Sequence, residues 1–399
     1  MTTTTNASVP QPGPLDGIRV LDFTIMMAGP YCTRFLADMG AEVIKVESAE
    51  GDYIRQREPK RDGHSTYFGH LNAGKRSVCL DLKDPASVAA VKAMVANCDV
   101  VVENFRPGAM QRLGLGYEAL KALNPRLVYC SISGFGQTGP DAQRPAYAQI
   151  VQAASGFESA QAGYQDGGDR PPNVAIFTAD VLGALFAYSG ILAALNQRHA
   201  TGVGQHIDAT LIESMLLLMP YEVQEAQFPA PQRRPVYPPL KASDGYLMLA
   251  AVSPRNFEML LDAIGIADWR ADAMLSTDRA RQQNWTAVMA RIEAWTSQRS
   301  CAEGARVLGG AGVPITPYRT VREALAEPQL AHRGSMARVV DGAGEYRVPN
   351  LPFKFSGGHV QVREHVPALG EDTERVLGEL AGLQGEALSA VIAKGKRAG

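Results

Sequence analysis

The sequence has little cysteine, no block of like charges and no apolar segment at its start. Its 5 cysteines are scattered and never in CxxC spacing, which gives no indication of a zinc site and suits free thiols in a reducing cytosol. The 39 Lys and Arg nearly balance the 41 Asp and Glu, and no polybasic run argues for a nucleic-acid or anionic-membrane partner. Residues 1–14 lack the pattern of a signal peptide and are expected to be flexible. We therefore expect a cytoplasmic protein that meets anionic ligands with a few placed cations.

What the sequence does contain is a regular alternation of short apolar runs and helical stretches. Hydrophobic residues make up 46% of the 399 residues, enough for more than one core. The apolar runs predict strands at 18–23, 42–47, 77–82, 99–103 and 127–131. The stretches between them predict helices at 28–39, 85–97 and 109–123. This alternation predicts βαβ units and an α/β fold with a doubly wound parallel sheet.

The second half of the chain predicts more helices and a second domain. Two helices are expected at about 175–196 and 209–227, and the polar residues of the first argue against a membrane span. Five prolines between Phe228 and Leu240 indicate a linker at 229–240. Beyond it we expect strands at 245–252 and 313–318, helices at 254–264, 286–298 and about 372–398, and a loop at 328–333.

Two glycine motifs resemble nucleotide-binding loops but lack the expected context. Gly134–Gly139 fits GxGxxG, yet Pro140 and a loop-like segment follow where a helix should begin, so a nicotinamide or flavin site is disfavoured. Gly69–Lys75 resembles a P-loop, but the next residue is Arg76 rather than Ser or Thr and a strand follows. Lys75 and Arg76 remain candidates both for phosphate contacts and for solvated surface charge.

Asp180 is the sharpest anomaly in the sequence. It is the only charged residue in the 22 positions from Val174 to Leu195. Burying a carboxylate is costly unless it is paired or neutralised, although the start of a helix offsets part of the cost. Gly183 would leave the adjacent helix face bare for a ligand. Composition alone leaves a functional carboxylate and a structural one, paired to an Arg or placed at a helix start, equally open.

Several motifs together resemble the class III coenzyme A transferases, which include formyl-CoA and carnitine CoA-transferases and have α-methylacyl-CoA racemase as a relative. They are PLDGIRVLDF, LNAGKRSVCLDLK, DVVVENFRPGAMQRLGLGYEAL, NPRLVYCSISGFGQTGP, TADVLGALFAYSGILAAL, TGVGQHIDATLIES and GVPITPYRTVREAL. The resemblance spans about 14–382. It implies a Rossmann-like large CoA-binding domain at 15–228, a smaller α+β domain at 241–335, and a C-terminal segment at 336–399 that returns to the large domain. It also implies an interlocked homodimer.

The resemblance assigns Asp180 as the nucleophile, because the aspartate of TADVLG is the family's acylated residue. It implies transfer of CoA from an acyl-CoA to a carboxylic acid through aspartyl anhydride and aspartyl-CoA intermediates, without a permanent cofactor or metal. The implied CoA contacts are Met27, Ala28, Leu80, Lys83, Asn104, Phe105, Arg106 and Arg112. The implied substrate-loop residues are Gly134, Gly136, Gln137 and Tyr147.

Departures from the family pattern bear on the substrate. Met27 and Ser48 stand where some transferases carry Gln and Arg, and no glycine run follows the linker, which argues against formyl-CoA and oxalate as the substrate pair. Tyr147 stands where the racemase has its histidine, so two-base racemisation lacks one partner. The alternatives are such proton transfer, or a non-catalytic acyl-CoA-binding protein.

A second carboxylate on the acceptor could meet one of several side chains. These are Arg144, Arg233, Arg234 and Tyr237, which are equally compatible with plain surface positions.

Overall fold

The computed structural model describes residues 12–165, 170–230, 235–266 and 268–396. The chain divides into two compact units: Met1–Ala226 joins Ala331–Gly399 in the first, and Gln227–Leu330 forms the second. Most of the expected flexible N-terminus, and Arg233 and Arg234 of the linker, lie outside the described residues. The assignment of functional domains to the two units stays a prediction.

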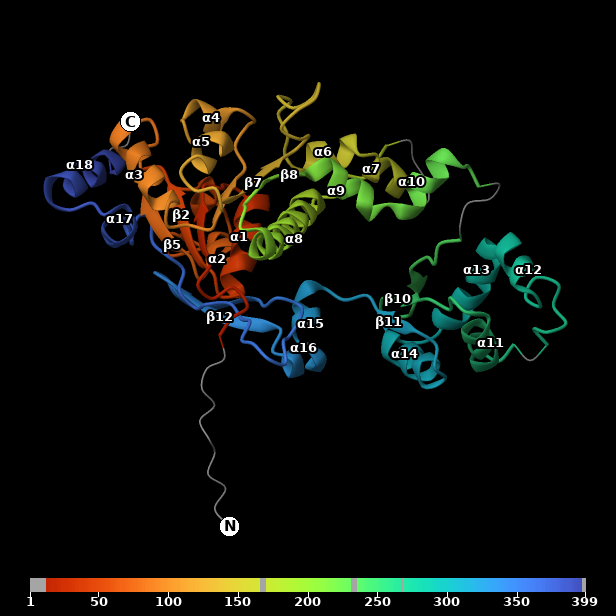
Figure 1. The fold of residues 1–399 in the computed structure, drawn as a ribbon. Coiled ribbons are helices and arrows are strands. Elements are labelled where there is room, and N and C mark those ends of the chain that lie inside the picture. Colours follow the sequence, from red (N-terminus) through yellow and green to blue (C-terminus); the bar gives the residue numbers. More distant parts are fainter. Residues whose placement is uncertain (1–11, 166–169, 231–234, 267, 397–399) are drawn as a thin grey trace, which may run out of the picture. The chain divides into compact units, whose positions relative to one another are not determined.

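A parallel sheet forms the centre of the first unit, with six strands among the described residues (Figure 1). In chain order they are β1 (Arg19–Asp22), β2 (Glu42–Glu47), β5 (Arg76–Cys79), β6 (Val100–Glu103), β7 (Val128–Ser133) and β8 (His206–Thr210). They lie side by side as β5-β2-β1-β6-β7-β8. The chain thus starts in the middle and builds outward to one edge and then the other, which is the doubly wound order. The predicted Rossmann-like α/β class is confirmed.

Helices cover both faces of this sheet, because successive strand residues point to opposite sides. Val20 of β1 lies in one core and its neighbour Leu21 in the other. The first core is covered by α1 (Ala28–Asp38), α6 (Ala148–Ala154), α8 (Thr178–Thr201) and α9 (Leu211–Leu218). The second is covered by α3 (Pro85–Val95), α17 (Thr373–Ala381) and α18 (Gly385–Gly395). The C-terminal helices, blue in Figure 1, therefore complete the same layer as α3.

Several predictions about helices were wrong in detail. The helix expected at about 372–398 is two helices, α17 and α18, with Gly382 at the end of the first. The helix expected at 109–123 is two short helices, α4 (Ala109–Arg112) and α5 (Tyr117–Lys121), separated by Gly114 and Gly116. The helix expected at 209–227 starts as strand β8 and then splits into α9 and α10 (Pro220–Gln227), because Pro220 has no N–H with which to continue α9. The loop expected at 328–333 is helix α16 (Pro328–Arg333).

A smaller apolar cluster joins the segment after β2 to the C-terminal part of the chain. It is built from η1 (Tyr53–Gln56), α2 (Thr66–Asn72) and the hairpin of β12 (Met336–Asp341) and β13 (Gly344–Pro349). Met26, Met27 and Tyr67 pack against its margin. The short ladder of β3 (Lys60–Arg61) and β4 (His64–Ser65) precedes α2.

The second unit is an antiparallel sheet covered by helices. Its strands are ordered β11-β10-β9, with β9 (Leu240–Lys241), β10 (Tyr246–Leu249) and β11 (Ile315–Pro317). Its helices are α11 (Pro254–Ala263), α12 (Asp278–Gln283), α13 (Trp285–Thr296), α14 (Cys301–Gly310) and α15 (Val321–Leu325). Leu249, Phe257 and Ile292 belong to its own core. This unit has the α+β composition expected of the smaller domain.

Within the described residues, α8 is the one helix long and apolar enough to cross a membrane by length and composition. Its Ala179, Ala187 and Ile191 are fully buried in the first core, against α1 and the sheet. That packing is typical of the central helix of a globular domain.

Candidate functional site

The first turn of α8 is held by α6, which places Asp180 at the start of a buried helix. Gln152 of α6 is fully buried, and its Nε2 donates to Val174 O at 2.9 Å. Its Oε1 accepts from Ala179 N at 3.4 Å, so one side chain fixes both the segment before α8 and its first turn. Asp180 follows directly, in the first turn.

The carboxylate of Asp180 is partly buried and lacks compensation. Burial raises its pKa from the ordinary 3.8 to about 7. The helix dipole acts in the opposite direction, but is worth only roughly 0.3–1 kcal/mol, less than one pKa unit. Among the described residues, no cation or hydrogen-bond donor pairs with this carboxylate. Tyr67 of α2 lies close enough for the Asp180 charge to contribute to its raised pKa of about 12, after the larger effect of burial.

Topology places Asp180 at the edge where parallel-sheet proteins bind ligands. Helices that connect parallel strands run against them, so α1 and α8 both begin at the carboxyl edge of the sheet. The rings of Phe35 in α1 and Tyr188 in α8 are in contact, with centroids 5.8 Å apart. Asp180 precedes Tyr188 by eight residues, and Met27 precedes Phe35 by eight. Since the helices run in parallel, Asp180 lies level with the turn that precedes α1.

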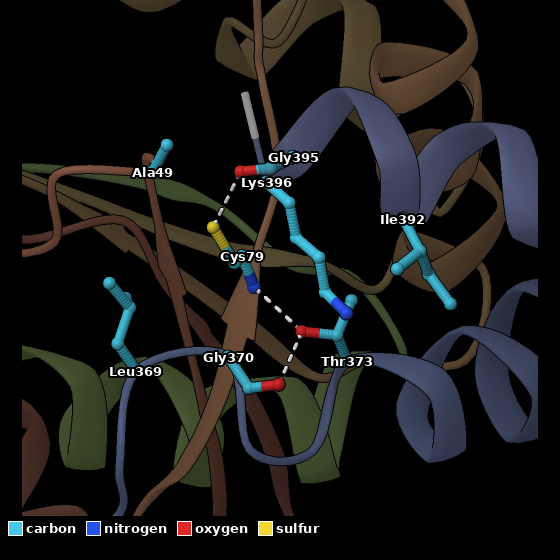
Figure 2. A pocket seen from close by; sticks show the side chains of 8 residues that line it. All are labelled: Ala49, Cys79, Leu369, Gly370, Thr373, Ile392, Gly395 and Lys396. Carbon is cyan, nitrogen blue, oxygen red and sulfur yellow. Dashed lines mark hydrogen bonds between the residues drawn. The ribbon is translucent and has the colours of Figure 1, made fainter. Parts of the chain in front are cut away.

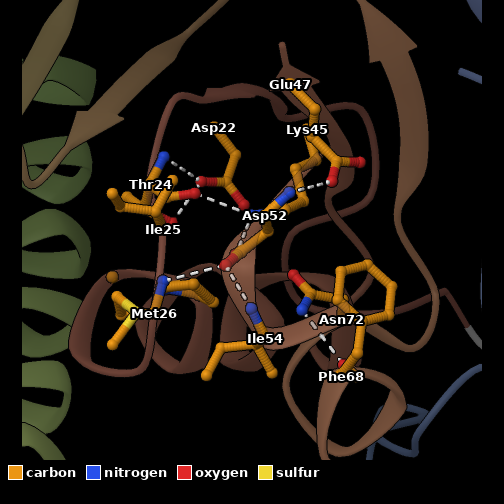
Figure 3. A network of polar contacts seen from close by, with 12 residues as sticks. Asp22, Thr24, Ile25, Met26, Lys45, Glu47, Asp52, Ile54, Phe68 and Asn72 are labelled. Carbon is orange, nitrogen blue, oxygen red and sulfur yellow. Dashed lines mark hydrogen bonds and ion pairs between the residues drawn. The ribbon is translucent and has the colours of Figure 1, made fainter. Parts of the chain in front are cut away.

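That turn, at the carboxyl end of β1, is fixed by buried charges (Figure 3). Lys45 Nζ donates to Thr24 O at 2.7 Å and forms an ion pair with Asp52 at 3.0 Å, both side chains being fully buried. Asp52 Oδ1 accepts from Met26 N at 3.2 Å, which holds Met26 at its unusual φ of 67°. Met27, next in the chain, is partly exposed, whereas the Ala28 side chain is buried. A ligand would therefore meet Ala28 through its backbone.

The loop after β6 is tied to the same turn at the point where the strand order reverses. Asn104 Oδ1 accepts from Ile25 N at 2.9 Å, and Asn104 Nδ2 donates to Ile25 O at 2.8 Å. Phe105 N donates to the buried Glu103 carboxylate at 2.9 Å. Arg106 and Arg112 are exposed and, within the described ranges, make no ion pair. Two cations are thus available beside the switch point.

The loop after β5 offers one side chain and one backbone group. Leu80 is buried and belongs to the second core, so its side chain is not available to a ligand. Lys83 is exposed and, among the described residues, forms no ion pair; its charge helps to lower the pKa of nearby Glu50.

The glycine loop after β7 folds over the same edge. A Cβ on Gly134 would lie 2.3 Å from the Ala146 Cβ, so glycine is needed for the loop to fold back on itself. Gly136 has φ 97°, and Gln137 N donates to Asp208 Oδ2 at 2.9 Å. Gln137 Nε2 is buried and, within the part of the chain the structure describes, has no hydrogen-bond partner.

Tyr147 immediately precedes α6, the helix that holds the Asp180 turn. Its side chain is 69% exposed. The ring is therefore free to contact a substrate or a second chain.

Two expectations drawn from single residues were wrong. Lys75 is buried and donates to Asp22, Pro30, Thr33 and Asn72, so it is neither a phosphate ligand nor a surface charge. Arg76 likewise pairs with Glu42, Glu379 and Asp372.

Gly183 does not open α8 to a ligand either. A Cβ there would lie 2.1 Å from Leu211 Cδ2, so glycine serves the close packing of α9 on α8.

Three site features gave no signal in the sequence. The fold joins distant segments here: Gln152 holds the first turn of α8, Asp208 holds the glycine loop, and Tyr67 lies within reach of the Asp180 charge. Among the described residues, no group of three His, Cys, Asp or Glu side chains could hold a metal ion.

Known proteins resemble this chain over almost its whole length. Residues 15–373 match the model of CoA-transferase family III. The chain belongs to this family. It is 38% identical to the acetyl-CoA:oxalate CoA-transferase of Acetobacter aceti, covering 90% of this chain and 92% of that one. It is 33% identical to the mouse succinyl-CoA:glutarate CoA-transferase, covering 96% and 90%. The crystal structure of a CaiB/BaiF family protein from Brucella suis superposes on this chain with a TM-score of 0.81 at 34% identity. The match covers 93% of this chain and 100% of the Brucella chain. The chain is therefore an enzyme of the CoA-transferase class, acting on CoA thioesters.

Proposed function

We propose that this enzyme moves CoA from an acyl-CoA donor to a small carboxylic acid, with Asp180 as the covalent nucleophile. The observation that supports this is the state of Asp180: a partly buried carboxylate with a raised pKa, at the edge of the sheet where ligands bind. A desolvated carboxylate is more nucleophilic than a hydrated one, and once acylated it is a good leaving group.

The proposed reaction has four exchanges at three carbonyl carbons: that of the donor, that of Asp180 and that of the acceptor. Asp180 attacks the thioester carbonyl, the C–S bond breaks, and CoA leaves as a thiolate. The thiolate attacks the aspartyl carbonyl of this anhydride and releases the donor acid, which leaves an aspartyl-CoA thioester. The acceptor carboxylate attacks the same carbonyl and expels the thiolate, and the thiolate then attacks the acceptor carbonyl to give the new acyl-CoA and free Asp180. Each step exchanges one acyl bond for another, so the sequence needs no ATP or metal.

Negative charge develops on carbonyl oxygens in each exchange and needs donors that are already in place. The unpartnered Nε2 of Gln137 and the backbone of the Gly134–Gly139 loop are the donors we propose. Asp208 acts as a positioning residue, because it holds Gln137 N.

For the CoA moiety we propose the turn at Met27–Ala28, the backbone at Leu80, and the loop at Asn104 and Phe105. Lys83, Arg106 and Arg112 would meet its phosphates, since they are exposed and lack ion pairs among the described residues.

For the acceptor we propose a small dicarboxylate. The two curated relatives are named for oxalate and glutarate, and both acids carry a second carboxylate. Arg144 is exposed, with its guanidinium 4.7 Å from the Phe135 ring centroid and 3.3 Å from Asp141. Arg144 is therefore the cation that we propose for the second carboxylate. Tyr237 instead packs on Trp285 in the second unit, and Arg233 and Arg234 lie outside the described residues.

Trapping the aspartyl intermediate tests the proposed function directly. The protein is incubated with succinyl-CoA and then hydroxylamine, and its intact mass is measured. Hydroxylamine converts an activated aspartyl carbonyl to a hydroxamate, which adds about 15 Da. We expect this adduct on the wild type and, by peptide mapping, on Asp180.

Asp180→Asn should give no adduct, whereas Asp268→Asn, which removes an exposed carboxylate of the second unit, should retain it. An absent adduct with succinyl-CoA and with oxalyl-, glutaryl- and acetyl-CoA would contradict covalent transfer. The same samples in deuterium oxide would then be assayed for exchange of the proton α to the thioester, which is the racemase-type reaction.

We also propose an interlocked homodimer in the cytoplasm. Large apolar side chains are exposed around the active-site helix, at Ile176, Phe177, Leu185, Phe186 and Leu217. Exposed apolar surface on this scale is typical of an interface. Light scattering on the purified protein should give twice the chain mass of 42.8 kDa at all practical dilutions. A monomer mass, or dissociation on dilution without unfolding, would contradict interlocking.

A further inference from the structure

A cavity of about 180 Å³ lies at the carboxyl end of β5, the edge strand of the large sheet (Figure 2). Its lining comes from three segments that are distant in sequence: the loop after β2, the end of β5, and the C-terminal part of the chain. The residues that line it include Ala49, Cys79, Leu369, Thr373, Ile392 and Lys396. The cavity therefore belongs to the ligand-binding edge.

The end of helix α18 is locked onto β5 by a close backbone approach. Cys79 Sγ donates to Gly395 O at 2.9 Å. A Cβ on Gly395 would lie 2.4 Å from Cys79 O, so no other residue allows this approach. The contact fixes where Lys396, the next residue, leaves the helix.

The opposite wall is equally well fixed. Thr373 Oγ1 accepts from Cys79 N at 3.0 Å and donates to Gly370 O at 2.7 Å. Gly370 N donates to Ser77 Oγ at 2.9 Å. The cavity is thus formed before any ligand arrives.

Lys396 lines this cavity with a positive charge and is itself an exposed residue. In Figure 2 its side chain runs across the cavity, between Cys79 and Ile392. Among the described residues it forms no ion pair. Burial raises the pKa of the Cys79 thiol to about 11, so the thiol is neutral at physiological pH and is no counter-ion. The nearby Glu47 is already paired with Arg55 at 2.7 Å.

Lys83 lies in the same neighbourhood. Its charge acts on Glu50, and the charges of Glu50 and Lys396 both act on Cys79. The two lysines therefore flank one region of the edge, and the single exposed carboxylate of Glu50 does not neutralise both.

We propose that Lys396, at the end of the C-terminal helix, binds the 3′-phosphate of CoA together with Lys83. A phosphate monoester is the part of CoA that calls for two ammonium groups, since it carries close to two negative charges at neutral pH. The cavity is smaller than the roughly 300–1,000 Å³ that holds a whole drug-sized ligand, so it takes one end of a long molecule. This inference rests on the proposed function.

The place of the cavity also fits the shape of CoA. Asp180 is on α8, which packs against β7 and β8 at one end of the strand order. The cavity is at β5, at the other end. Four strand spacings, roughly 19 Å, separate β5 from β7. CoA carries its thiol and its phosphorylated ribose at opposite ends of a long arm, so the two ends would occupy these two places.

Isothermal titration of the full-length protein with CoA and with dephospho-CoA, which lacks only the 3′-phosphate, tests the proposal. We expect the wild type to prefer CoA by about ten-fold or more, in line with charge-assisted contacts. Lys396→Ala should weaken CoA binding by about five- to ten-fold and leave dephospho-CoA unchanged. Lys396→Arg should retain the preference, and Lys394→Ala, on the same helix but outside the cavity, should behave as the wild type.

Each other outcome overturns the proposal. Equal weakening of both ligands by Lys396→Ala would indicate a structural role, and no weakening would remove Lys396 from the site. If the wild type binds CoA and dephospho-CoA equally well, the 3′-phosphate of bound CoA lies in solvent and Lys396 does not bind it. If the wild type binds neither ligand, the proposed function fails as well, which distinguishes the two failures.

Discussion

Replacing Asp180 by Asn is expected to abolish transfer and at the same time to stabilise the fold. Loss of a covalent nucleophile should lower kcat by at least about 10³-fold. The amide has nearly the same shape but carries no charge. It therefore removes the cost of holding an ionised carboxylate at a partly buried position that, among the described residues, offers no partner.

The gain in stability should depend on pH with a definite sign. The pKa of Asp180 is about 7 in the folded chain and close to 3.8 when unfolded. Above pH 7 the carboxylate is ionised in both states, so the folded state bears the full cost, roughly 2 kcal/mol after allowing for solvent screening. As pH falls from 7 toward 4 the folded carboxyl binds a proton first and the cost disappears. The thermal midpoint of Asp180→Asn should exceed that of the wild type by several degrees at pH 8 and match it near pH 4.

The exposed Asp268→Asn provides the matched control, and should change neither activity nor midpoint at either pH. An Asp180→Asn protein that is less stable than the wild type at pH 8 would show that the carboxylate has a stabilising partner. One that retains substantial transfer would exclude Asp180 as the nucleophile. The joint result expected here, more stable and inactive, is the signature of a group kept for chemistry rather than for folding.

Local patterns were enough to predict the central strands but not the edge strand β8. β1, β2, β6 and β7 are buried on both faces and are mostly apolar in sequence, although Lys45 interrupts the run in β2. β8 is partly exposed, and its His206 and Asp208 interrupt the apolar pattern, so its residues were partly assigned to the following helix. The apolar residues before Pro220 predict one continuous helix, whereas the proline separates α9 from α10.

The candidate site likewise contains one residue that the sequence predicts and others that only the fold brings together. Asp180 could be found from sequence, because a lone charge in an apolar helix conflicts with its surroundings. The residues that surround Asp180 could not be found, since Gln152 lies 28 residues and Tyr67 more than 100 residues from it along the chain. The contrast between Lys83 and Lys75 makes the same point. Both lie in loop-like segments, yet one is exposed and the other is fully enclosed by residues that only the fold brings together.

Lys75→Met is therefore expected to be among the most destabilising substitutions in the large unit. Lys75 Nζ donates to Asp22 Oδ2 at 2.9 Å, Thr33 Oγ1 at 2.7 Å and Asn72 Oδ1 at 2.8 Å, and its side chain is fully buried. Methionine fills a similar volume but leaves the Asp22 carboxylate without this partner. Breaking a buried ion pair from one side costs about 3–5 kcal/mol.

Urea unfolding should show this loss as a lower midpoint, with Lys354→Met, at an exposed position, leaving the midpoint unchanged. Lys75→Met combined with Asp22→Asn should recover part of the loss, because no unpaired charge is then left inside. The ion pair spans β1, α1 and the end of α2, and so anchors the turn that presents Met27 to the proposed CoA site. The double variant should therefore recover more of the lost stability than of the lost CoA affinity. A single variant as stable as the wild type would show that Asp22 is neutral in the fold, which contradicts the lowered pKa that Lys75 helps to give it against the effect of burial.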